Sequence, residues 1–109
     1  MNIWEIHTKN RLTIISDTSN FDVSYMKDAE TTFTKFDNIQ SYGDNLYTID
    51  HTFDELGTYI IKLQEPGGLV RYNQLSVVDK AEFDFMKTNT KYNNSFEGAS
   101  LVFEENKGN

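Results

Sequence analysis

Residues 52–63 constrain the fold of this chain more than any other stretch. They read Thr-Phe-Asp-Glu-Leu-Gly-Thr-Tyr-Ile-Ile-Lys-Leu. The part from Asp54 to Gly57 has the composition of a tight corner, where glycine supplies backbone angles that other residues avoid. The part that follows alternates as a half-buried strand does, with three large side chains on one face: Tyr59, Ile61 and Leu63. The sequence therefore predicts a corner that opens a strand, with the Tyr59 ring in the core and its hydroxyl turned back to the corner backbone.

The rest of the chain up to residue 79 also predicts strands. Alanine occurs only three times, whereas β-branched and aromatic residues are plentiful, and this balance favours sheet over helix. Alternating segments are separated by turn formers. The expected strands cover residues 3–8, 12–16, 21–25, 31–36, 46–53, 58–63 and 69–78. We predict an all-β, antiparallel β-sandwich of about seven strands, although a small barrel would give nearly the same pattern.

Charge and cysteine content exclude several classes of function. The net charge is −7 and no run of Lys or Arg occurs, so the surface repels phosphates and we expect no nucleic-acid partner. Without cysteine there is no disulfide framework and no thiolate site. The first residues lack the basic flank and apolar run of a secretory signal, and no segment has membrane-spanning length. We therefore expect a chain made in the cytoplasm, with no membrane partner.

Residues 80–109 differ from residues 1–79. Their apolar residues are spaced irregularly by polar ones, and a closed sandwich has little room for so many. One interpretation is an extended C-terminal arm that docks on a neighbouring subunit. The other is a segment that wraps back over its own domain, with residues 101–103 adding an edge strand. On the first interpretation the partner-binding residues are Phe83, Phe85, Met86, Tyr92, Phe96, Leu101 and Phe103.

The sequence offers little for catalysis or metal binding. His7 is expected to face solvent, and His51 to lie half-buried on a strand face with Tyr47 and Ile49. No nucleophile elbow, phosphate loop or zinc-protease motif occurs. Three carboxylates near one corner offer a possible Ca²⁺ site, namely Asp50, Asp54 and Glu55, but the usual calcium-loop pattern is absent. We predict a non-enzymatic protein without a cofactor or a bound metal.

The corner Asp54, Gly57 and Tyr59 resembles the one that opens a late strand in Ig-like modules, including bacterial and PKD-type repeats. The resemblance extends loosely over residues 1–79 and implies an Ig-like β-sandwich. The chain departs from antibody-type domains, because it has no cysteine pair and its only tryptophan is Trp4. This departure argues against an immune or receptor role.

An Ig-like domain with an aromatic arm looks like the small virion proteins of tailed bacteriophages, such as head decoration and neck or tail accessory proteins. The abundance of Asn, Lys, Ile, Tyr, Phe and Asp is similar to that of proteins from AT-rich phage genomes. The resemblance implies a structural virion protein whose partners are capsid or connector subunits, or a second copy of itself. The alternative function is a recognition module that binds glycan or a cell surface through the loop at 37–45, where Tyr42 and Tyr47 lie near Asn38 and Asn45.

Overall fold

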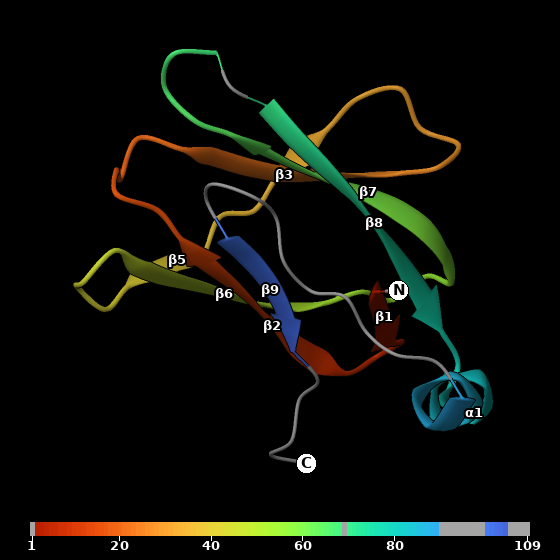
Figure 1. The fold of residues 1–109 in the computed structure, drawn as a ribbon. Helices are drawn as coiled ribbons and strands as arrows, with labels where there is room; N and C mark the ends of the chain where they lie inside the picture. The colour runs from red at the N-terminus through yellow and green to blue at the C-terminus, as the bar shows by residue number, and fades with distance from the viewer. Residues whose placement is uncertain (1, 69, 90–99, 105–109) are drawn as a thin grey trace.

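The computed structural model describes residues 2–68, 70–89 and 100–104. Within these residues the chain forms nine strands and one helix (Figure 1). The elements in chain order are β1 (Asn2–Glu5), β2 (Lys9–Ile15), β3 (Asp22–Lys27), β4 (Thr34–Lys35), β5 (Ile39–Ser41), β6 (Leu46–Thr52), β7 (Gly57–Gln64), β8 (Val70–Val78), α1 (Lys80–Asn89) and β9 (Ser100–Glu104). The prediction of an all-β fold is confirmed, with more strands than the seven expected.

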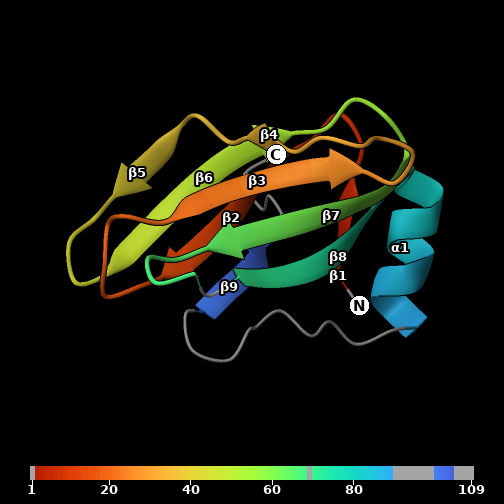
Figure 2. The same ribbon diagram turned by 90° about the horizontal axis from the view of Figure 1, so that it is seen from above.

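The strands form two sheets that lie face to face as a sandwich (Figure 2). The five-stranded sheet has the order β1-β8-β7-β3-β4, and the four-stranded sheet has the order β5-β6-β2-β9. Neighbouring strands are antiparallel except β1 and β8, which run parallel. The two sheets and the corner before β7 make this an Ig-like β-sandwich.

Alternating residues from both sheets fill the space between the layers. On β2, Leu12 and Ile14 are fully buried, whereas Ile15 is 46% exposed, as the alternation predicts. On β7 the predicted inward face is also buried, and β3 contributes Val23. The buried core is Trp4, Leu12, Ile14, Phe21, Val23, Phe36, Ile49, Phe53, Tyr59, Ile61, Leu63, Leu75 and Val77. Period-two alternation therefore identified the inward faces of these strands.

The corner has the predicted geometry. The Tyr59 hydroxyl donates a hydrogen bond to the Glu55 carbonyl oxygen at 3.1 Å, and the Tyr59 ring is buried. Gly57 has φ +139°, and a Cβ there would lie 3.0 Å from Lys27 Cε. The backbone angle favours glycine at this position, and a side chain there would also have to displace the end of the lysine side chain.

The C-terminal residues belong to the sandwich in the part that the structure describes. Helix α1, which was not predicted, lies beside β1, where Phe83 is buried with Ile3 and Val78 (Figure 1). Strand β9 pairs with β2, with Leu101 opposite Ile14. The second of the two interpretations, an added edge strand, therefore describes residues 100–104. No helix in the described ranges is long and apolar enough to cross a membrane.

Three other local predictions differ from the structure. The strand expected at 3–8 ends at Glu5, and residues 6–8 form a turn in which His7 adopts φ 61° and its amide donates to the Phe53 carbonyl oxygen at 2.9 Å. The strand expected at 31–36 is reduced to the two residues of β4. The loop expected at 37–45 contains β5, which pairs with residues 47–49 of β6.

Candidate functional site

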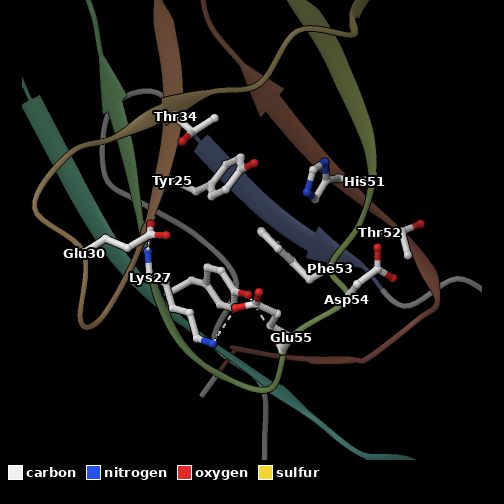
Figure 3. Close-up of a pocket in the computed structure, with 10 residues that line it drawn as sticks. Tyr25, Lys27, Glu30, Thr34, His51, Thr52, Phe53, Asp54 and Glu55 are labelled. Carbon is white, nitrogen blue, oxygen red and sulfur yellow. Dashed lines mark hydrogen bonds and ion pairs between the residues drawn. The ribbon is translucent and has the colours of Figure 1, made fainter.

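A pocket of about 310 Å³ opens on one side of the sandwich, between β3 and β6 (Figure 3). Its lining residues are Tyr25, Lys27, Glu30, Thr34, His51, Thr52, Phe53, Asp54, Glu55 and Tyr59. The edge strands beside the pocket are short. Strand β4 has two residues, and β5 pairs with β6 only at residues 47–49, so the part of β6 that carries His51 is not paired with β5.

Aromatic rings form the wall of the pocket, and Phe53 lies at their centre. Its ring centroid is 4.2 Å from that of Tyr59, 4.4 Å from that of His51 and 5.1 Å from that of Tyr25. These tilted and edge-to-face contacts hold each ring in a fixed orientation. In Figure 3 the rings of Tyr25, His51 and Phe53 surround the hollow. The wall is therefore a rigid aromatic surface.

Charged side chains form the rim. Lys27 Nζ lies 2.8 Å from Glu55 Oε1, and Glu30 Oε1 accepts the Lys27 amide at 3.0 Å. On the other side of the rim, Asp54 Oδ1 lies 3.0 Å from His7 Nδ1. The lining residues thus carry three carboxylates and one ammonium group. The rim therefore carries more negative than positive charge.

Burial shifts the pKa values of two groups in the wall, His51 and Tyr25. Desolvation lowers the pKa of His51 below its usual 6.5, and Asp37 and Asp54 oppose this only in part, so the imidazole is neutral at pH 7. Desolvation raises the pKa of Tyr25, and Glu30 and Asp37 raise it further. Its hydroxyl therefore stays protonated. The hydrogen bond to Glu55 is the main cause of the raised pKa of Lys27, which stays charged.

Several polar atoms in the pocket are available to a ligand. Within the residues that the structure describes, neither the Tyr25 hydroxyl nor the His51 ring nitrogens make a hydrogen bond to protein. His51 has no carboxylate partner there, and the other histidine, His7, lies at the exposed rim with Asp54. The arrangement offers binding contacts rather than a nucleophile joined to a base.

The three carboxylates considered for Ca²⁺ do not converge. Asp50 bonds Arg11 at 2.9 Å, while Asp54 and Glu55 pair with His7 and Lys27. No group of three or more potential metal ligands lies together in the described part of the chain. Asp50 has a lowered pKa because Arg11 donates to its carboxylate.

The residues predicted to bind a partner have different environments. Phe83 is 5% exposed and packs inside its own domain, so its assignment as a partner contact is wrong. Met86 packs beside it, partly buried, whereas Phe85 is 66% exposed. Tyr92 and Phe96 lie outside the described residues. Leu101 and Phe103 are in β9, where the register places them opposite Ile14 and Leu12.

Of the two tyrosines predicted to bind glycan, one is exposed and the other is not. Tyr42 is 54% exposed, and its hydroxyl lies 3.4 Å from Gln40 Oε1. Tyr47 instead packs edge-on against Phe21 at 4.9 Å between centroids and is partly buried against the core. A sugar platform of two tyrosines therefore does not form.

Sequence reasoning placed His51 on the correct strand face but missed the pocket. The available signal was a histidine followed two residues later by Phe53 on the inward face of one strand. A histidine on an inward strand face is found either in a fully packed core or beside a pocket that opens into it. The pocket lies beside the part of β6 that is not paired with β5, and β5 was not predicted.

No protein-family model and no curated protein matches this sequence. Among solved structures, the chain is similar to the crystal structure of the ZIG-8 IG1 homodimer, with a TM-score of 0.41 and 12% sequence identity. The match covers 72% of this chain and 80% of that chain. At this level of similarity we draw no conclusion about function from it.

Proposed function

We propose that this chain is a non-enzymatic recognition domain that binds a partner protein through the pocket between β3 and β6. The observation that carries the proposal is the rigid aromatic wall with unbonded polar atoms on Tyr25 and His51. Buried aromatic pockets with a polar rim are where binding energy concentrates in protein interfaces. The fold itself does not name a function.

The experiment selects binders of the natural protein from a random peptide library. The affinity of the selected peptides is then compared between the natural protein and a variant whose pocket is filled. Thr34 is exposed and lines the pocket, so Thr34→Trp places a large ring in the hollow without changing the core. We expect selected peptides to lose at least about tenfold in affinity for the variant. A library that yields no binders, or binders with equal affinity for both proteins, would contradict the proposal.

A narrower form of the proposal makes the chain a virion structural protein, as a capsid decoration or head–tail accessory subunit made in the host cytoplasm. It is supported by the composition and by Phe85, which is exposed on α1. The expected result is co-sedimentation of the purified protein with assembled phage particles, reduced by Phe85→Ala. Folded protein without affinity for any capsid or connector subunit would refute this narrower form alone.

A glycan is the second candidate ligand class, favoured by the exposure of Tyr42. A glycan screen tests it. Tyr42→Ala is expected to abolish any hit, because Tyr47 cannot replace the lost ring. Binding that survives in the variant would exclude this loop as the glycan site.

A further inference from the structure

We propose that the pocket between β3 and β6 receives a lysine or arginine side chain of the partner protein. The inference rests on the proposed function and names the chemistry that the pocket recognises. Its basis is the combination of an aromatic wall and an acidic rim around a hollow of about 310 Å³, which has room for one long side chain. Figure 3 shows the opening between Glu30 on one side and Asp54 on the other.

The charge of the rim favours a cation. The single charge of Lys27, which is bonded to Glu55, offsets one of the three carboxylates of the lining, so a net negative charge remains. Asp37 acts on the same space, since it contributes to the pKa shifts of both Tyr25 and His51. An anion would meet repulsion from these carboxylates. A cation would meet attraction strengthened by the low dielectric of the aromatic wall.

The wall also favours a cation. The faces of aromatic rings carry negative charge density, and an ammonium or guanidinium group within about 6 Å of a ring centroid is attracted to it. The same chain already shows this contact elsewhere, because Lys62 Nζ lies 5.0 Å from the centroid of Phe33. The long stems of lysine and arginine bury against rings while the charged group reaches an acidic rim.

The polar atoms of the wall suit the same ligand. A neutral His51 has one ring nitrogen that accepts a hydrogen bond, and the Tyr25 hydroxyl oxygen is a second acceptor. Both face the pocket and lie near each other, with ring centroids 5.3 Å apart. Ammonium and guanidinium groups carry only donors, so these acceptors complement them.

The test uses two small probes that differ by one charged group. Nα-acetyl-lysine methyl ester carries the cation, and Nα-acetyl-norleucine methyl ester has the same stem without it. We expect the lysine probe to shift the ring NMR signals of His51 and Tyr25 saturably at millimolar concentration, and the norleucine probe to shift them far less. Equal shifts from both probes would overturn the inference while leaving the proposed function intact. No shift from either probe would overturn the inference as well, whereas the proposed function is judged separately by the peptide selection.

Variants of matched charge locate the effect. Glu30→Gln with Asp54→Asn should weaken binding of the lysine probe by at least about fivefold, because both carboxylates face the pocket. The control Asp17→Asn with Asp22→Asn also removes two carboxylate charges, but neither residue lines the pocket, and Asp22 lies at the far end of β3, where it pairs with Lys35. The control should bind the probe as the natural protein does. Equal weakening in the control would mean that net charge alone attracts the probe, and would overturn the inference.

Acid should weaken binding of the lysine probe. The groups around His51 are the rings of Tyr25, Phe36 and Phe53 and the carboxylates of Asp37 and Asp54. As pH falls below 6.5 and through its lowered pKa, His51 gains a positive charge and repels the probe. His51→Gln should lose this pH step. A step that persists in the variant would contradict the role of His51 as an acceptor.

Discussion

The two halves of β6 belong to one continuous strand, yet their side chains have different environments. The half at residues 47–49, which we call the covered half, is paired with β5, and there Ile49 is fully buried while Tyr47 packs against Phe21. The half that carries His51 and Thr52 is not paired with β5, and its side chains line a pocket. The comparison teaches that the inward side chains of one strand can be core where its edge is paired and can line a pocket where its edge is unpaired.

The largest change in stability is expected from a substitution in the covered half of β6. Ile49→Ala removes fully buried methyl and methylene groups and leaves a cavity between the sheets, so it should cost about 3 kcal/mol of unfolding free energy. Urea denaturation measures this loss. Thr52→Ala, on the open half, is the control and should change little. A loss below about 1 kcal/mol for Ile49→Ala would mean that the covered half is not packed as described.

The corner at the base of the pocket should show an intermediate effect. Tyr59→Phe keeps the ring but removes the hydrogen bond to the Glu55 carbonyl, at a cost of about 1 kcal/mol. The loss should appear in the same denaturation assay. Unchanged stability would show that the hydroxyl does not hold the corner.

A smaller effect should appear as a pH dependence of stability in the open half. The unfolded chain binds a proton at His51 near pH 6.5, whereas the folded chain binds it only at lower pH, because burial lowers the pKa. The stability that the neutral imidazole contributes is therefore present above pH 6.5 and is lost as pH falls through the folded pKa. Denaturation of the natural protein and of His51→Gln between pH 7.5 and pH 5 should show a steeper decline for the natural protein. Parallel curves would contradict the burial of His51.

The smallest change in stability is expected from a substitution outside β6, at an exposed ion pair. The ion pair between Lys35 and Asp22 joins side chains that are 72% and 60% exposed. Asp22→Asn should change the unfolding free energy by less than about 0.5 kcal/mol, because solvent screens such pairs. Thermal unfolding checks this value. A larger change would disqualify the variant as a neutral control for the pocket.

Alternation in the sequence was enough to predict most of the sandwich. The inward faces of β2, β6 and β7 follow from period-two patterns, and the corner follows from Gly57 and Tyr59. These features are local, because each depends on residues within one strand or turn. Local patterns survive in the fold when tertiary contacts agree with them.

Helix α1 was missed although a local signal for it was present. Asp79 accepts the amide of Glu82 at 2.8 Å, which is the N-cap half of a capping box, and Phe83 and Met86 lie three residues apart on the buried side of the helix. The composition of the chain favoured sheet so strongly that this signal was not used. The pocket could not be predicted in the same way. It depends on where β5 ends relative to β6, a long-range property that no single segment records.

The most direct test of the central claim is to follow ring NMR signals from the pocket and from the covered half of β6 with its packing partner Phe21 while a peptide selected for binding is added. We predict that the signals of His51 and Tyr25 shift with increasing peptide, while those of Phe21 and Tyr47 in the covered half stay unchanged. Shifts confined to Phe21 and Tyr47, or equal shifts in both halves, would show that the open half of β6 is not the binding surface.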